Sequence, residues 1–139
     1  MSAVPRTVSL NVLNPDFTPT AAVTAARIEN VAQDAYNYAV DNPNVSGLSR
    51  VRLGRYAEIQ ATRTLRRWAL RNGVQLGDSG LRFQASAGAS IPDVVYEPAK
   101  RIFDFKLSPA AIRPSQTASI MADFPNYDLR YILGPDTWR

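Results

Sequence analysis

Two short apolar segments on either side of a proline-containing turn restrict the possible folds of this chain most strongly. Residues 91–96 and 102–107 are rich in β-branched and aromatic side chains, which favour strands. The four residues between them, 97–100, include Pro98 and are typical of a turn. The sequence therefore predicts a tight hairpin in which the two strands lie side by side.

The predicted hairpin gathers three charged side chains. Side chains alternate along a strand, so Asp104 and Lys106 share one face while Phe103 and Phe105 share the other. The hairpin brings Asp93 beside the first pair. Two carboxylates can hold a hard divalent cation and an ammonium can orient an attacking water, as metal-assisted phosphodiester hydrolysis requires. The alternative is a surface hairpin whose charges are solvated or paired across strands.

Pro92-Asp93, followed by Asp104-Phe105-Lys106 eleven positions after the first aspartate, resembles the signature of the PD-(D/E)xK nuclease superfamily, which has the restriction-endonuclease-like fold. The resemblance covers residues 50 to about 135. It implies that Asp93, Asp104 and the Phe105 backbone carbonyl bind Mg²⁺ or Mn²⁺. Lys106 would then position the hydrolytic water and stabilise the transition state. By analogy with the family, no covalent intermediate forms and the products carry 5′-phosphate and 3′-hydroxyl ends.

An amphipathic helix is predicted over residues 54–71, with Asn72-Gly73 as its C-terminal stop. Its apolar arc consists of Ala57, Ala61, Leu65, Trp68 and Ala69. Glu58 falls inside this arc, where a carboxylate is costly unless it is paired or bound to a metal. The family carries an acidic residue on the corresponding helix, so the resemblance implies that Glu58 assists the metal directly or through water. Alternatively, Glu58 is simply favourable near a helix N-terminus.

The other predicted elements complete an αβββαβ order, a four-stranded mixed sheet flanked by helices in an α+β or α/β fold. A first strand spans residues 81–85 and a last strand 127–133, stopped by Gly134-Pro135. Between them a helix runs from 109 to about 123, with Ser108 as its N-cap. This order is that of the nuclease superfamily core, which we assign to residues 50–139.

The predicted helix after the hairpin carries two further candidate site residues. Several branches of the superfamily have a Gln or Lys here that faces the active site, and Gln116 resembles that residue. The alternative is an exposed helical glutamine. Arg113 either contacts a phosphate or is one more surface arginine.

Residues 1–49 match no motif and are predicted to form an extension that packs on the core. A strand over residues 7–13 ends at Asn14-Pro15. A helix over residues 19–40 follows, with Thr18 as its N-cap and Pro19 at its first position. Its tyrosines are interpreted as core packing.

The chain of 139 residues contains no cysteine and no histidine. This excludes disulfides, thiolate zinc sites, Ser-His-Asp triads and nucleases that use a histidine base. Carboxylate–metal chemistry or a glycosidase-like carboxylate pair remains. No apolar run approaches a membrane span, and the N-terminus lacks the apolar segment of a signal peptide.

Arginine is concentrated on the predicted basic helix. Residues 50–71 hold half of the fourteen arginines, and Glu58 is their only acid. The net charge of +4 and the pI near 9.8 favour a polyanionic partner, which we expect to be DNA rather than RNA. Four arginines are expected on the side of the helix opposite the apolar arc: Arg55, Arg63, Arg66 and Arg67.

A compact nuclease core behind a short leader resembles the C-terminal toxin domains of bacterial polymorphic toxins and secretion-system effectors. That resemblance implies delivery into a target cell, action in its cytoplasm and a cognate immunity protein as partner. Three alternatives remain open. The chain is a phage or repair nuclease, a non-catalytic nucleic-acid-binding domain of the same fold, or a glycosidase with Glu58 as its acid.

Overall fold

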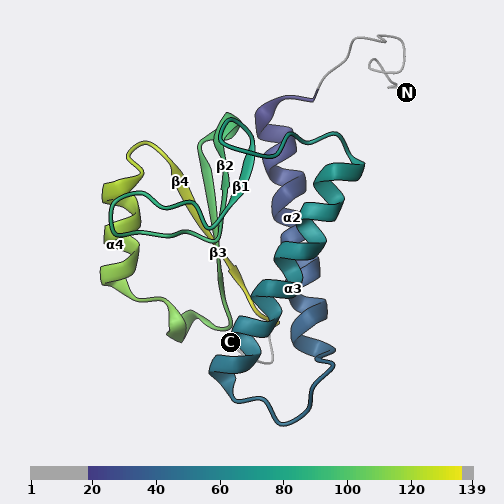
Figure 1. The fold of residues 1–139 in the computed structure, drawn as a ribbon. Helices are drawn as coiled ribbons and strands as arrows, with labels where there is room; N and C mark the ends of the chain where they lie inside the picture. Colours follow the sequence, from purple (N-terminus) through teal and green to yellow (C-terminus); the bar gives the residue numbers. More distant parts are fainter. Residues whose placement is uncertain (1–18, 136–139) are drawn as a thin grey trace, which may run out of the picture.

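The computed structural model describes residues 19–135, which form an α+β fold of three helices and one four-stranded mixed sheet (Figure 1). The helices are α2 (Ala21–Asp41), α3 (Arg50–Arg71) and α4 (Pro114–Asp123). The strands are β1 (Leu81–Phe83), β2 (Val94–Tyr96), β3 (Arg101–Lys106) and β4 (Asp128–Leu133). From α3 onward, the predicted order of helix, three strands, helix and strand is confirmed. The predicted strand over residues 7–13 lies outside the described residues.

The sheet has the strand order β1-β2-β3-β4. The first three strands are antiparallel neighbours, and β2 and β3 form the predicted hairpin. Its turn is a 3-10 turn, Glu97–Ala99, that ends at Lys100 in the left-handed region with φ 52°. Strand β4 pairs parallel with β3, which requires a crossover connection, and α4 lies within that connection.

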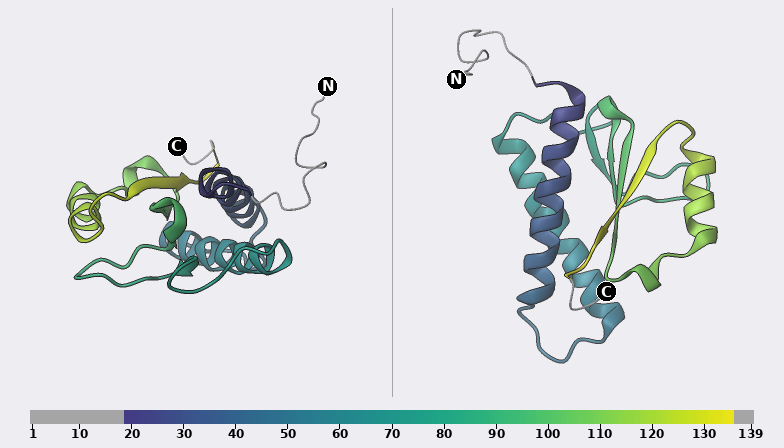
Figure 2. Two further views of the ribbon diagram at one scale, coloured as in Figure 1. Left: turned by 90° about the horizontal axis from the view of Figure 1, so that it is seen from above. Right: turned by 180° about the vertical axis from the view of Figure 1, so that it is seen from behind.

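Helices cover both faces of the sheet. On one face, α2 and α3 pack together against Phe103 and Phe105, which are buried with Ile28 and Leu65 in the main core. On the other, α4 covers a smaller cluster that includes Ile102 (Figure 2). The alternation predicted for residues 102–107 is therefore confirmed for these side chains. The buried side chains of α2 belong to the same core as those of α3.

The helix starts differ from the predicted ones, because capping groups determine them. The N-cap of α2 is Thr20 rather than Thr18, and its hydroxyl accepts from the N–H of Val23. Helix α3 begins four residues before Gly54, after Ser49, whose hydroxyl caps the N–H of Arg52. The longer α3 brings Arg50 alongside the site described below.

The boundaries after the hairpin also differ. Residues 109–123 are not one helix: a 3-10 turn, Pro109–Ala111, precedes α4, and Ser108 makes no side-chain cap. Proline disfavours helical geometry in the residue before it, so Arg113 stays extended and α4 begins at Pro114. Strand β1 stops at Phe83, because Gln84 has φ 52° and cannot continue an extended strand.

None of the helices within residues 19–135 combines the length and the apolar character needed to cross a bilayer. Helices α2 and α3 have 21 and 22 residues, long enough in principle. The first is amphipathic, however, and the second carries seven arginines.

Candidate functional site

Asp93 and Asp104 lie side by side where β2 meets β3. Val94 stands opposite Phe103 in the antiparallel pair, so the residue before Val94 faces the residue after Phe103. The backbone N–H of Asp93 donates to Oδ1 of Asp104 over 3.0 Å. Asp104 is buried, with 3% of its surface exposed. The hairpin thus brings the two carboxylates together, as its geometry predicts.

Strand β3 continues beyond the start of β2, and Phe105 lies in this extension. Its backbone N–H donates to Oδ2 of Asp93 over 2.8 Å. The N–H and C=O of one residue point to the same side of a strand, so the Phe105 carbonyl also points toward the side of Asp93. No β2 residue pairs with Phe105, which leaves that carbonyl available to a ligand.

Lys106 extends toward both Asp104 and α4. Its Nζ donates to Oε1 of Gln116 over 2.8 Å and lies 3.9 Å from Oδ2 of Asp104. Gln116 is therefore in contact with the charged cluster, whereas Arg113 is exposed at the N-cap of α4. Within residues 19–135, the Arg113 side chain makes no hydrogen bond or ion pair with these groups.

Glu58 of α3 completes the acidic cluster, the name used here for Glu58, Asp93 and Asp104. It is half-buried, and its Oε2 accepts from Nε2 of Gln84 over 3.4 Å. Glu58 and Asp93 are close enough to hydrogen-bond through their carboxyl groups. Gln84 also donates its backbone N–H to the carbonyl of Asp93, so it links both acids.

Burial and mutual repulsion make the acidic cluster hard to ionise. Burial, followed by the charge of Glu58, raises the pKa of Asp93 to about 6. Burial, followed by the charge of Asp93, raises the pKa of Asp104 to about 7. Burial also raises the pKa of Glu58. Three carboxyl groups with raised pKa values at one place are typical of a functional site, since they cost stability when they are all ionised.

A hollow of about 380 Å³ opens beside the acidic cluster, between α3 and the end of β3. Glu58 and Lys106 line it, and so does Tyr36 of α2, whose ring lies 4.9 Å from that of Phe105. Burial, followed by the charges of Glu58 and Asp93, raises the pKa of Tyr36. Tyr36 and Gln84 were missed by sequence reasoning, because nothing in the local pattern relates them to residues so distant in the chain.

The predicted separation of the arginines from Glu58 is wrong. Arg55, Arg63 and Arg66 line a second hollow together with Glu58, because Glu58 lies at the edge of the buried stripe of α3 and not at its centre. Arg67 is turned away from them and lines a different hollow, between α2 and α3. Glu58 and Arg55 thus line both hollows, the one that contains Lys106 and the one that contains Arg63 and Arg66.

The donor set suits a hydrated Mg²⁺ or Mn²⁺. Such ions prefer oxygen ligands and are commonly held by one or two carboxylates, retained waters and substrate phosphates. Asp93, Asp104 and the Phe105 carbonyl offer oxygens of this kind, and Glu58 can reach through water. Within residues 19–135, no group of three or more His, Cys, Asp or Glu side chains is placed so that it could hold a metal ion by itself. Asp93 and Asp104 would be the two carboxylates of such a site, and water and substrate phosphate would supply the other ligands.

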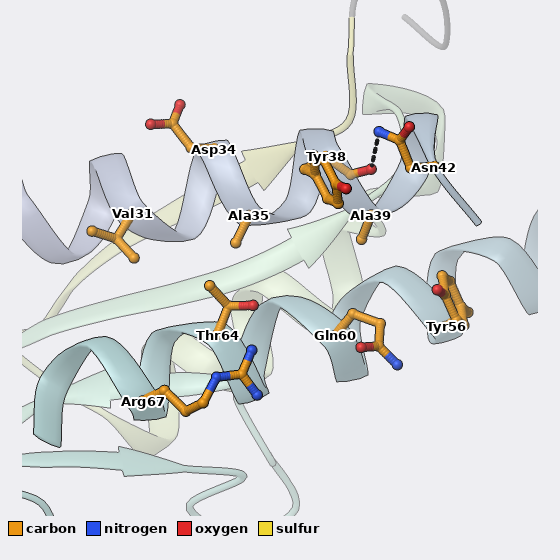
Figure 3. A pocket seen from close by; sticks show the side chains of 10 residues that line it. All are labelled: Val31, Asp34, Ala35, Tyr38, Ala39, Asn42, Tyr56, Gln60, Thr64 and Arg67. Carbon is orange, nitrogen blue, oxygen red and sulfur yellow. Dashed lines mark hydrogen bonds between the residues drawn. The ribbon is translucent and has the colours of Figure 1, made fainter. Parts of the chain in front are cut away.

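A larger hollow, of about 540 Å³, lies elsewhere, between α2 and α3 (Figure 3). Tyr38, Gln60 and Arg67 are among its lining residues, and the Nδ2 of Asn42 donates to the backbone carbonyl of Tyr38 at its edge. Asp34 is its only carboxylate. Size alone favours this hollow, but hydrolytic chemistry needs the converging charges at the acidic cluster, so we assign the candidate site there.

The acidic cluster should make the metal-free protein less stable as the pH rises. Asp104 has a higher pKa when folded than the unfolded value of 3.8, so its stabilising contribution is complete below that value and is lost as pH rises through about 7. Asp104→Asn removes the charge and keeps an oxygen for the Asp93 N–H. We expect its advantage in unfolding free energy over wild type to grow between about pH 4 and pH 7, reaching roughly 1–3 kcal/mol.

Urea unfolding in the presence of a chelator measures this difference across the pH range. A difference that stays constant, or that shrinks as pH rises, would contradict the assignment of a strained acidic cluster. Asp78→Asn is the matched control, because Asp78 is exposed in the loop before β1.

Comparison with protein-family models, with curated proteins and with solved structures gave no match.

Proposed function

We propose that the chain is a divalent-metal-dependent nuclease that hydrolyses phosphodiester bonds at the acidic cluster. One observation carries the proposal: Glu58 of α3, Asp93 just before β2, and Asp104 and Lys106 of β3 converge on one end of the sheet. The hydrogen-bonded pair of aspartates, the adjacent lysine and the PD-(D/E)xK resemblance all support the same chemistry.

In this proposal Asp93, Asp104 and the Phe105 carbonyl hold Mg²⁺ or Mn²⁺, with Glu58 acting through a bound water. The ion would lower the pKa of a water and neutralise charge on the phosphate. The chain supplies orientation: the Phe105 N–H fixes one oxygen of Asp93, and the Asp93 N–H fixes one oxygen of Asp104. Each carboxylate keeps its other oxygen for the cation.

Lys106 provides the positive charge at the scissile phosphate. Gln116 and Asp104 hold its ammonium group, so it is oriented before substrate arrives. An ammonium fixed in this way can position the hydrolytic water and stabilise the negative charge that develops in the transition state. The water oxygen forms a bond to phosphorus as the bond from phosphorus to the 3′ oxygen breaks. The leaving 3′ oxygen keeps the electron pair and takes up a proton, and the attacking water loses one, so the products are a 5′-phosphate and a 3′-hydroxyl.

We further propose that DNA is the substrate and that the chain acts as an antibacterial toxin or effector after delivery into a target cell. The three arginines beside Glu58 can neutralise backbone phosphates without reading sequence. A cognate immunity protein would neutralise the enzyme by covering this basic side. A phage or repair nuclease would use the same site. If expression of the wild-type protein in the cytoplasm proved harmless to the cell, that role would be favoured over the toxin.

A second candidate is a non-catalytic DNA-binding domain of the same architecture. The arginine surface favours it, because that surface needs no metal to bind DNA. The two candidate functions differ in what happens when metal is added. A nuclease cleaves the DNA, whereas a binding domain binds it and leaves it intact.

Incubation with supercoiled plasmid tests the proposal. We expect wild-type protein to nick or linearise the plasmid in Mg²⁺ or Mn²⁺ and to be inactive in EDTA, with 5′-phosphate ends on the products. Asp78→Asn, purified in parallel, should cleave like wild type. If DNA is bound but stays intact at every metal concentration, the nuclease proposal is wrong and the non-catalytic binding domain takes its place.

A further inference from the structure

The arginine hollow, the name used here for the hollow that Arg55, Arg63, Arg66 and Phe83 line beside Glu58, has a volume of about 340 Å³. Glu58 and Arg55 line both this hollow and the one that contains Lys106, so the two hollows adjoin at these side chains. A ligand in the arginine hollow would therefore lie next to the candidate catalytic groups.

One wall of the arginine hollow is a stacked pair of flat groups. The guanidinium of Arg66 lies over the ring of Phe83, with 4.6 Å between Cζ and the ring centroid. Phe83 is half-buried at the end of β1, so its position is fixed by the sheet. Within residues 19–135, no carboxylate forms an ion pair with Arg63 or Arg66. The face of the Arg66 guanidinium that points away from Phe83 is therefore not covered by an ion pair with a carboxylate.

Two further residues that line the hollow offer a polar edge and an apolar surface. Gln84, held at φ 52°, presents an amide beside Glu58, and an amide can both donate and accept hydrogen bonds. The side chain of Ile59 is 42% exposed at the same hollow. A hollow built only for phosphate needs neither an aromatic–arginine stack nor an exposed isoleucine.

We propose that the arginine hollow binds an unpaired nucleobase of the substrate, stacked on the Arg66–Phe83 pair and next to the scissile phosphate. The inference rests on the proposed nuclease function and specifies its substrate as single-stranded or locally opened DNA. Bases stack on aromatic rings and guanidinium planes, and this contact tolerates any sequence. In an intact duplex each base is already stacked and paired, so it must leave the helix to enter such a hollow.

Binding measurements without cleavage test this inference. Fluorescence anisotropy with Asp104→Asn as the binding-competent background compares an oligothymidine with a blunt-ended, fully paired duplex of two strands. We expect the single strand to bind roughly ten-fold more tightly, and an abasic residue at one position of the strand to weaken binding by a similar factor. Adding Phe83→Leu, which keeps apolar packing but removes the ring, should abolish the abasic effect.

Circular dichroism establishes that the Phe83→Leu variant is folded, and Arg66→Ala provides an independent test of the stacked pair. Arg71→Ala is the control: it removes one positive charge from α3 outside the arginine hollow, so it should leave the abasic effect intact. Equal affinity for single strand and duplex, or an abasic effect that persists without Phe83 and Arg66, would overturn the inference. Neither outcome shows whether the protein cleaves DNA. If wild-type protein with metal leaves DNA intact, the nuclease proposal is refuted, but the binding measurements still show whether the arginine hollow binds a base.

Discussion

Asp104→Asn is expected to reduce plasmid cleavage by about 10³-fold or more while leaving the protein folded. Asp104 is buried, its Oδ1 is fixed by the Asp93 N–H, and its Oδ2 faces Lys106. An amide in its place keeps the shape and the accepted hydrogen bond but removes the negative charge that a cation needs. The loss should appear in the rate of cleavage at saturating DNA, because substrate binding depends on the arginines.

Initial rates of plasmid relaxation in Mg²⁺ measure this loss, and the unfolding experiments above establish that the variant is folded. Asp78→Asn carries the same chemical change at an exposed position and should cleave at the wild-type rate. If Asp104→Asn cleaves DNA at a rate within a few-fold of the wild-type rate, the Asp104 carboxylate is not required by the mechanism.

Lys106→Ala is expected to reduce cleavage by about 10²–10³-fold, with little effect on metal binding. Its ammonium group is positioned by Gln116 and Asp104 at the edge of the hollow, where it can reach a substrate phosphate. Alanine removes the charge that would stabilise the transition state and leaves both aspartates in place. Gln116→Ala should cause a smaller loss, because it frees the lysine without removing it.

The chain contains a matched control for this change, since its only other lysine is Lys100. Lys100 pairs with Glu97 over 2.6 Å in the hairpin turn, away from the acidic cluster. Lys100→Ala should leave the cleavage rate unchanged. Equal rates for wild type and Lys106→Ala would refute the assigned role of Lys106.

The hairpin and the order of elements could be predicted because both depend on local patterns. Alternation along residues 102–107 identified the two faces of β3, and a tight turn necessarily places Asp93 near Asp104. Element boundaries were less accurate, because they depend on which hydroxyl caps a helix and on single residues such as Gln84 with positive φ. Patterns of hydrophobicity do not contain that information.

The other residues of the site come together only through tertiary packing, which local sequence patterns do not predict. Tyr36 comes close to Glu58 and Asp93 only because α2 packs against α3 and the sheet, and its spacing along α2 is that of any core residue. Glu58, Arg63 and Arg66 have fixed positions relative to one another on α3, but which of them face the sheet or line a hollow depends on how α3 packs. A helical projection assigns residues to sides, but the packing of neighbours decides where the buried stripe ends.

Titration with Mn²⁺ is the most direct test of whether the acidic cluster binds a divalent metal, because the result does not depend on which substrate the protein cleaves. Free Mn²⁺ can be followed by electron paramagnetic resonance during titration of wild type, Asp104→Asn and Lys106→Ala. We expect saturable binding by wild type and by Lys106→Ala, and its loss in Asp104→Asn. Wild-type protein that leaves Mn²⁺ free, or Asp104→Asn that binds Mn²⁺ as wild type does, would refute a metal site at the acidic cluster.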